Sequence, residues 1–223
     1  KKYDVAIVGA GPAGVFAAYE LAEKKPGLSI VVLESGNDIY HRCCPIAAGK
    51  VKSCIGCKPC SIMRGFGGAG AFSDGKYNFT TQFGGWLGEY ISSSEVMRLI
   101  EYVDAINMRH GAPAKVFSTK GSRIGKLALE HDLHLLEASV RHLGTENNLK
   151  MLEKTYEYMK ERVEFRFGAS VKNILSDGEG ENALALESGD RITAEYLVVG
   201  AFGRRMVLRG MSAAARRAEE QSS

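Results

Sequence analysis

A glycine-rich turn between two apolar runs constrains the fold of this chain more than any other feature. The first run, residues 3–8, leads directly into the sequence GAGPAG at residues 9–14, and a helical stretch follows over residues 15–25. A second apolar run, residues 28–33, ends at Glu34, about 20 residues beyond the last glycine of the turn. This order of strand, turn, helix, strand and acid predicts a βαβ unit that binds an adenine dinucleotide.

The residues of this unit have separate physical roles. Gly9 permits the tight turn, Gly11 lets the backbone approach a pyrophosphate, and Gly14 allows close packing of the helix on the strand. The N–H groups at the start of the helix face the phosphates. Because the carboxylate of Glu34 accepts hydrogen bonds from ribose hydroxyls and repels a 2′-phosphate, the sequence favours FAD or NAD over NADP. The position of the unit at the start of the chain favours FAD by analogy with flavoproteins. The expected cofactor contacts here are Gly9, Gly11, Pro12, Ala13, Gly14, Glu34 and Ser35.

Composition and charge limit the classes of partner. The chain has 223 residues, an ordinary hydrophobic content and a net charge of +3, which gives no argument for nucleic acid. No apolar run approaches the roughly 20 residues that span a bilayer. No signal peptide is recognisable before the first strand, so we expect a cytoplasmic protein without a membrane span. The expected partner is a small-molecule substrate or an external electron donor, and the sequence does not indicate an oligomeric state.

Apolar periodicity predicts an α/β domain over residues 1–210, with a parallel sheet and helices on both of its faces. Helices are expected from near Ser94, over residues 123–130 and over residues 148–161, and a strand over residues 133–136.

The carboxyl-terminal part of the sequence is predicted to form short strands followed by a tail. Short strands around residues 165–195 are expected to form a small β insertion. The apolar run at residues 196–201 is expected to return to the parallel sheet beside the first strand. Residues 211–223 are rich in Ala, Arg and Glu and are expected to be helical or disordered.

A long segment at residues 35–90 is rich in glycine and cysteine and has little periodicity. Because long structureless loops in compact domains are usually functional, we interpret it as a cofactor loop. Its glycine run lets backbone N–H groups reach anionic oxygens, and a serine and a lysine add a donor and a positive charge. The expected contacts in this run are Gly67, Gly68, Ala69, Gly70, Ser73, Asp74, Gly75 and Lys76.

Three segments together resemble one family of proteins. GAGPAG at residues 9–14, GGAGAFSDGK at residues 67–76 and LVVGAFGR at residues 197–204 are similar to a poorly characterised group of FAD-dependent dehydrogenases and oxidoreductases. That group is related to the glutathione reductase-like flavoproteins with two dinucleotide-binding domains. RHLGT at residues 141–145 is also similar to a segment of the group.

The resemblance implies a Rossmann-like FAD/NAD(P)-binding fold and an oxidoreductase activity. It also implies cofactor contacts from Ala201 and Gly203. Members of the group are considerably longer, and the Gly-Asp segment that closes the flavin site in the wider superfamily does not follow Gly203. We therefore expect a chain that is truncated at its carboxyl terminus.

The five cysteines lie close together in the sequence, between residues 43 and 60. Three of them form a CxxCxxC pattern, which with a fourth thiolate suits an iron–sulfur cluster or zinc. The alternatives are a redox-active dithiol near the flavin or a set of reduced thiols without special function. The candidate metal ligands are Cys44, Cys54, Cys57 and Cys60.

One histidine is a candidate for catalysis. His142 lies in the RHLGT segment, where it serves either as a hydrogen-bonded loop residue or as a substrate-facing acid or base. The leading hypothesis from the whole sequence is an FAD-binding oxidoreductase that moves a hydride or two electrons between FAD and an unidentified small molecule. The alternatives are a non-catalytic FAD- or metal-binding module left by truncation, and an iron–sulfur electron-transfer protein.

Overall fold

The computed structural model describes residues 1–176 and 182–200. These residues form two compact units. The first unit combines Lys1–Ala71 with the chain from Thr155 onward, and the second unit is Phe72–Lys154. The sequence analysis treats residues 1–210 as one domain, whereas here a long excursion between β2 and β6 forms a unit of its own. The expected tail, residues 211–223, lies outside the described residues.

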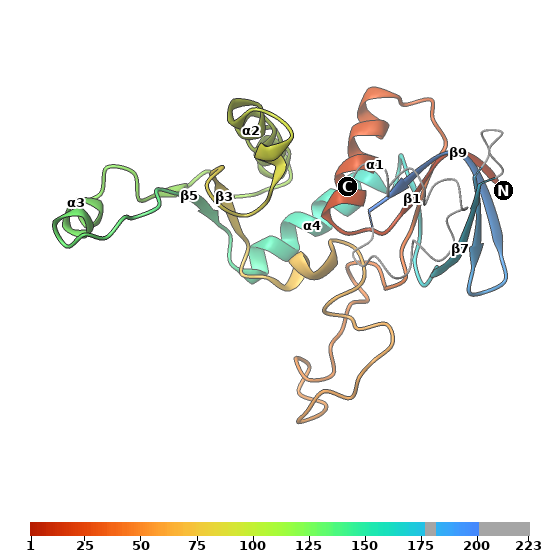
Figure 1. Ribbon diagram of the computed structural model, residues 1–223. Coiled ribbons are helices and arrows are strands. Elements are labelled where there is room, and N and C mark those ends of the chain that lie inside the picture. Colours follow the sequence, from red (N-terminus) through yellow and green to blue (C-terminus); the bar gives the residue numbers. More distant parts are fainter. Residues whose placement is uncertain (177–181, 201–223) are drawn as a thin grey trace. The chain divides into compact units, whose positions relative to one another are not determined.

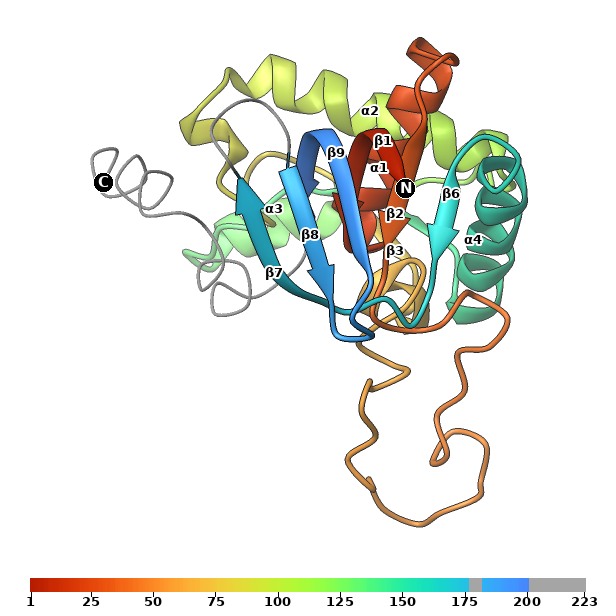
Figure 2. The same ribbon diagram turned by 90° about the vertical axis from the view of Figure 1, so that its right-hand side faces the viewer.

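The first unit is built on a six-stranded sheet with the order β6-β2-β1-β9-β8-β7 (Figure 2). The strands β6, β2, β1 and β9 pair in parallel, and β8 is antiparallel to both of its neighbours. The elements are β1 (Lys2–Val8), α1 (Pro12–Lys24), β2 (Ile30–Leu33), β6 (Glu164–Arg166), β7 (Val171–Ser176), β8 (Asn182–Leu186) and β9 (Arg191–Val199).

The central parallel strands are apolar and buried on both faces over residues 5–8 of β1 and over the whole of β2, as expected for buried parallel strands. Helix α1 packs on one face of β1 and β2, and its neighbour there is α4 (Thr145–Met159), through a stack of Tyr19 on Tyr158 (Figure 1). The other face presents Ala6, Val8, Val31 and Leu33, which share a hydrophobic cluster with residues of β7 and β8. Because β7 and β8 belong to the same sheet, the apolar side chains of this face cluster with those of its antiparallel end, and no helix residue of the described chain belongs to this cluster, where a second layer of helices was expected.

The predicted α/β dinucleotide-binding fold is confirmed by this sheet. Strand β9 returns beside β1 in parallel, with Val5 opposite Tyr196 and Val8 opposite Val199. The strands expected in a separate insertion at residues 165–195 are present, but they belong to the same sheet. They do so because β9 is one continuous strand, in which residues 191–194 pair with β8 and residues 193–199 pair with β1.

The second unit contains a three-stranded antiparallel sheet with the order β3-β5-β4 (Figure 1). Helix α2 is capped by Ser92, whose side chain accepts a hydrogen bond from the N–H of Glu95 at 3.2 Å. The elements are β3 (Lys76–Phe79), η2 (Leu87–Glu89), α2 (Ser93–Arg109), β4 (Phe117–Ser118), α3 (Arg123–Glu130) and β5 (Ser139–His142), after η1 (Gly68–Phe72) at the boundary.

The helices of the second unit match the sequence pattern, and one strand does not. The helices expected from near Ser94 and over residues 123–130 are present as α2 and α3, and the helix expected over residues 148–161 is present as α4. The prediction of a strand over residues 133–136 is wrong, because the nearest strand, β5, begins at Ser139. Its apolar residues Leu133 and Leu136 are exposed, so no sheet buries them. In the described chain, no helix is both long and apolar enough to cross a membrane.

Candidate functional site

A cavity of about 710 Å³ lies in the first unit, at the carboxyl ends of β1 and β2. The neighbours of β1 in the sheet are β2 on one side and β9 on the other, so the strand order reverses at β1. Open α/β sheets bind ligands at such a point. The cavity is lined by Val8, Gly9, Gly11, Pro12, Ala13, Leu33, Glu34, Ser35, Met63, Arg64, Gly65, Gly68, Ala69, Gly70, Ala169, Val171, Lys172, Asn173, Ile174 and Gly200.

The glycine turn forms one wall of this cavity. Gly9 has a φ of 96°, which only glycine adopts readily, and its N–H donates to the carbonyl of Leu33 at 2.8 Å. A Cβ on Gly14 would lie 1.9 Å from the carbonyl oxygen of Gly9, so this glycine is required for packing. A Cβ on Gly11 would meet nothing closer than the oxygen of Gly200 at 4.0 Å. A side chain on Gly11 would therefore not clash with the protein, and the absence of one leaves open space beside the turn.

Helix α1 begins at this turn with its N–H groups unsatisfied. Gly11 is the N-cap residue, and Pro12 occupies the first helical position without an N–H of its own. Among the described residues, the backbone N–H groups of Ala13 and Gly14 have no backbone partner. Free N–H groups and the positive end of the helix dipole favour an anion at this place.

Glu34 is 6 % exposed and joins three segments of the wall. Its Oε2 accepts a hydrogen bond from the N–H of Ala10 at 2.8 Å. Its Oε1 accepts from the N–H of Gly36 at 2.7 Å and from the N–H of Gly65 at 3.1 Å. A carboxylate has about four acceptor positions, so Oε2 keeps one for a ligand hydroxyl. The residue holds the wall together and also remains able to act as the expected ribose acceptor.

Arg42 organises the second wall, and the sequence analysis did not identify it. Its guanidinium is 7 % exposed. It donates to the carbonyl oxygens of Ser61, Ile62, Phe66 and Gly68 at 2.6–2.9 Å. Burial lowers the pKa of Arg42 to about 10, against the opposing influence of Glu34 and Cys60. An arginine in an irregular loop has no sequence signal for such a role, because its partners are backbone carbonyls.

An aromatic cluster fixes the same loop to the sheet and to α4. Phe66 is fully buried and contacts the rings of Tyr156 and Phe165 at centroid distances of 5.0 and 5.6 Å. The next residue along the chain, Gly67, contacts the glycine turn: its N–H donates to the carbonyl of Ala10 at 2.8 Å. The two glycine segments of the sequence are therefore in direct contact.

Two cations line the cavity without a protein partner. Within the residues that the structure describes, the side chains of Arg64 and Lys172 are exposed and make no ion pair or hydrogen bond. The sequence analysis missed both, since each lies outside a recognisable motif. Their charges complement an anionic ligand such as a pyrophosphate.

The structure brings many of the expected cofactor contacts together around the cavity of the first unit. The cavity is lined by Gly9, Gly11, Pro12, Ala13, Glu34, Ser35, Gly68, Ala69 and Gly70. Gly14 and Gly67 support this wall by packing and by hydrogen bonding. Ala201 and Gly203 lie outside the described residues.

Four expected contacts lie in the second unit instead, because the glycine run crosses the boundary after Ala71. Ser73, Asp74, Gly75 and Lys76 form a turn that leads into β3. Lys76 pairs with Asp74 at 2.7 Å, and the carbonyl of Gly75 accepts from the N–H of Leu143 at 2.9 Å. In the second unit, these residues serve the local turn.

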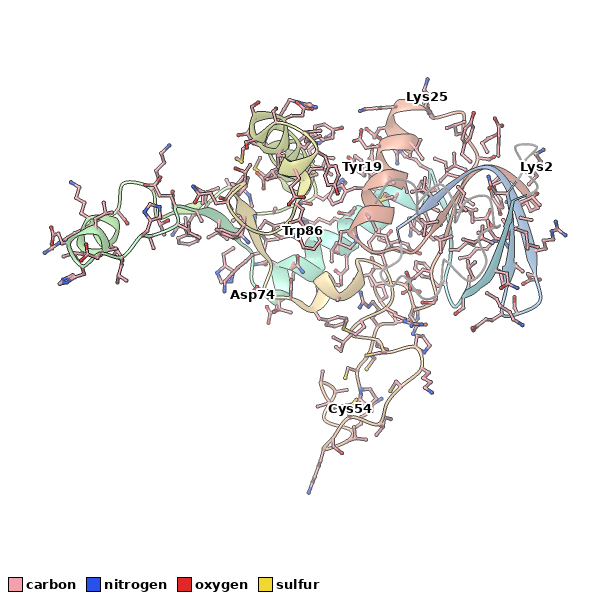
Figure 3. All side chains as sticks on the ribbon, in the orientation of Figure 1. Lys2, Tyr19, Lys25, Cys54, Asp74 and Trp86 are labelled. Atoms are coloured by element: carbon pink, nitrogen blue, oxygen red, sulfur yellow. The ribbon has the colours of Figure 1, made fainter. Side chains whose placement is uncertain are left out.

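The cysteines do not form a metal site in the structure. Cys43 and Cys54 are exposed, and Cys44, Cys57 and Cys60 are half-buried, all as free thiols. Figure 3 shows Cys54 on the long loop. No group of three His, Cys, Asp or Glu side chains in the described residues is placed to hold a metal ion. The expected cluster of Cys44, Cys54, Cys57 and Cys60 is therefore not supported. The loop that carries them contains turns but no helix or strand that would bring the thiols together.

His142 ends β5 in the second unit, opposite Lys76 of β3. Its side chain is exposed, and its charge contributes to a lowered pKa of Asp74, for which the hydrogen bond from Lys76 is the largest cause. It does not line the cavity of the first unit. Its role as an acid or base stays a prediction.

Comparison with protein families supports the sequence resemblance. Residues 4–50 match the family described as FAD dependent oxidoreductase. The matched segment includes most of β1, all of α1 and β2, and the start of the following loop. The resemblance to FAD-dependent oxidoreductases is confirmed over this segment. No curated protein matches the chain by sequence.

Solved flavoenzyme structures are similar at low identity. NikD, an amino acid oxidase of nikkomycin biosynthesis, has 13 % identity and a TM-score of 0.49 over 94 % of this chain and 54 % of its own. Glycine oxidase from Geobacillus kaustophilus has 18 % identity and a TM-score of 0.48 over 90 % of this chain and 55 % of its own. An open cyclohexanone monooxygenase has 17 % identity and a TM-score of 0.45 over 89 % of this chain and 26 % of its own. The chain spans about half or less of the length of these proteins.

Proposed function

We propose that the cavity of the first unit binds the ADP half of FAD and that the chain is the FAD-binding part of an oxidoreductase. The observation that carries the proposal is the combination of a free helix N-terminus, an open glycine turn and the buried carboxylate of Glu34 around one cavity. The family match over residues 4–50 supports FAD as the dinucleotide.

The residues of the cavity fit the pyrophosphate and the ribose of a dinucleotide. The space beside Gly11 suits a pyrophosphate, which the N–H groups of Ala13 and Gly14 would meet. Arg64 and Lys172 would add charge opposite the phosphate oxygens. The free acceptor position on Glu34 Oε2 would take a ribose hydroxyl.

When bound, FAD supplies two-electron and hydride chemistry that no protein side chain provides. The contribution of this chain is binding and orientation. Glu34 and Arg42 hold the two walls at a fixed separation through backbone hydrogen bonds, so the cavity is formed before the ligand arrives. The negative charge of Glu34 disfavours a 2′-phosphate, so FAD and NAD are accepted in preference to NADP. The reduced or oxidised partner is a small molecule.

The test compares two alanine substitutions that the fold tolerates equally. In Gly11→Ala the new methyl group occupies the space for the pyrophosphate, whereas in Gly27→Ala it meets nothing within 4 Å. Titration calorimetry with FAD is expected to show binding to the unmodified chain and to Gly27→Ala. We expect Gly11→Ala to lose affinity by tenfold or more, with an unchanged melting temperature.

Three further ligands separate the parts of the proposal. ADP is expected to compete with FAD, and FMN, which lacks the AMP moiety and so has no pyrophosphate and no adenosine ribose, is expected not to bind. NAD that binds as tightly as FAD would assign the cavity to a dinucleotide other than flavin. FMN binding without competition by ADP would contradict the assignment of the glycine turn. Oxidoreductase activity is then tested by anaerobic loss of visible flavin absorbance in the FAD complex, with a panel of amines, amino acids, alcohols and NADH as donors.

A further inference from the structure

A second cavity, of about 330 Å³, lies wholly within the second unit. It is formed between β3, η2 and α2, and most of its wall is apolar. Tyr77 and Phe79 of β3 form one side, and Val96, Ile100 and Val103 of α2 form the other. Its size is at the lower end of the range for small-molecule sites, about 300–1,000 Å³, and suits one ring with a few substituents.

The single acidic side chain of this wall is already neutralised. Asp104 is buried and binds the guanidinium of Arg141 through two hydrogen bonds, at 2.6 and 2.7 Å. Arg141 is buried as well, and it also donates to the carbonyl of Pro113. Asp104 is the only charged residue among the described residues that line the cavity, and no lysine or arginine lines it. A charged ligand would therefore lose its hydration without gaining a partner.

One polar group at the wall has no partner in the protein. Asn107 is only 5 % exposed. Its backbone carbonyl accepts from the N–H groups of His110 and Ala112, at 3.1 and 3.0 Å. In the described chain, its side-chain amide makes no hydrogen bond. Every side-chain nitrogen or oxygen of the described residues that is fully sealed from solvent does have a hydrogen-bond partner, so the atoms of this amide are not sealed. The amide thus remains accessible from the cavity, where it offers both a donor and an acceptor.

The other polar group near this wall is occupied. The hydroxyl of Tyr77 donates to Oδ1 of Asn148 at 2.6 Å, and burial raises the pKa of Tyr77, so the phenol stays neutral. Apart from the exposed Asn78, the cavity therefore presents an apolar enclosure, a neutralised charge and the accessible amide of Asn107. The accessible amide of Asn107 can exchange its hydrogen bonds with water for hydrogen bonds with a ligand that carries a matching polar group.

We propose that this cavity binds an uncharged, ring-sized organic molecule that carries one hydroxyl or carbonyl group, which pairs with the side-chain amide of Asn107. The site is separate from the dinucleotide cavity, and its existence does not depend on FAD binding. It assigns to the second unit a ligand-binding role.

The test uses three fluorinated probes that share one ring. Fluorobenzene, 4-fluorophenol and 4-fluorobenzoate are titrated with the 223-residue chain, and binding is followed by ¹⁹F NMR. We expect 4-fluorophenol to bind more tightly than fluorobenzene by about three- to tenfold, the effect of one hydrogen bond. We expect 4-fluorobenzoate to bind most weakly, because its carboxylate finds no cation.

Two variants identify the place of binding. Asn107→Leu keeps the size of the side chain and is expected to remove the preference for 4-fluorophenol over fluorobenzene. Ile100→Trp fills the cavity and is expected to abolish binding of both. Glu101→Ala, an exposed change on the same helix, is expected to leave both affinities unchanged. Saturating ADP is expected to leave the probe bound.

Several results would overturn the proposal. No binding of any probe by the folded chain would remove the site. A preference for 4-fluorophenol that persists in Asn107→Leu would remove the role of the amide. Tightest binding of 4-fluorobenzoate would contradict the uncharged ligand class. Displacement of the probe by ADP would place it in the first cavity. Hydrogen exchange of α2 in each variant shows whether the unit is folded, so a variant that unfolds is replaced by Ile100→Phe.

Discussion

The two cavities of this molecule are built by different means. The first combines backbone, from a glycine turn, a helix N-terminus and a loop whose carbonyls bind Arg42, with side chains such as those of Leu33 and Ile174. The second is surrounded by side chains, with two aromatic residues opposite an apolar helix face and the amide of Asn107. The first suits a charged ligand and the second an uncharged one.

This difference determines what a sequence reveals. A site made of backbone requires glycines at fixed spacing, because any other residue would fill the space or clash. A site made of apolar side chains uses the same residue types as a core, so its helix has the pattern of any amphipathic helix. The contrast predicts that different substitutions damage the two units independently.

The largest expected effect is on the second unit, in Asp104→Ala. The change leaves the buried guanidinium of Arg141 without its counter-charge, which destabilises folded proteins by about 3–5 kcal/mol. We expect faster hydrogen exchange in β3, α2 and β5, measured by mass spectrometry of peptides, and an unchanged affinity for FAD.

The control for this change is Arg98→Ala on the same helix. Arg98 pairs with Glu95 at an exposed position, where ion pairs contribute little, so exchange should not change. If Asp104→Ala and Arg98→Ala exchanged at equal rates, the Arg141 pair would have no role in holding the second unit.

The next effect is on the first unit, in Arg42→Ala. The change leaves four carbonyls of the glycine loop without their donor, and we expect a loss of unfolding free energy of about 2–3 kcal/mol. Affinity for FAD should fall together with the stability, and probe binding in the second unit should persist.

Arg64→Ala is the matched comparison, since this exposed arginine is expected to affect affinity alone. Chemical denaturation and calorimetry on both variants provide the measurement. Equal stability of the two variants would contradict the structural role of Arg42.

Arg42 also marks the limit of prediction from this sequence. The βαβ unit, the place of Glu34 and the return of β9 beside β1 follow from local patterns, and the structure has all three. Arg42 contacts backbone atoms 19 to 26 residues away, and no local pattern encodes such contacts.

Other differences have similar causes. The glycine run at residues 67–76 was interpreted as one cofactor loop, but the chain passes from one unit to the other within it. The apolar residues at positions 133–136 resemble a strand in composition, yet β5 forms further along, where Val140 pairs with Asn78 and Phe117. The amide of Asn107 gave no signal, since an asparagine on a helix is usually exposed and here is buried.

A smaller effect separates the two glycines of the turn. In Gly14→Ala the new Cβ would lie 1.9 Å from the Gly9 oxygen, so the helix must move, and overpacking of this kind costs about 1–3 kcal/mol. In Gly11→Ala no atom is closer than 4.0 Å, so the melting temperature should not change. Thermal denaturation of both variants without ligand measures the difference. Equal melting temperatures would show that the turn adapts, and the division between a packing glycine and a ligand-facing glycine would be lost.

The smallest effect is the dependence of the first unit on acid. Burial alone would raise the pKa of Glu164, but hydrogen bonds from Lys1, Tyr3 and Arg166 lower it from 4.5 to about 2. A carboxyl group whose pKa is lower in the folded state stabilises the fold above its unfolded pKa and loses that contribution as the pH falls through the folded value. The contribution of Glu164 is therefore present above about pH 4.5 and declines towards pH 2.

The measurement is the melting temperature of the unmodified chain and of Glu164→Gln at a series of pH values between 7 and 2, a range that includes both pKa values. The side chain of Glu164 is 35 % exposed, so solvent screens the interaction and the difference at neutral pH should be only a few degrees. The two curves should converge as the pH falls, because the protonated carboxyl group and the amide make similar neutral hydrogen bonds. Curves that stay parallel would show that β6 is held to β2 by its backbone pairing and its aromatic cluster, without a contribution from the charge of Glu164.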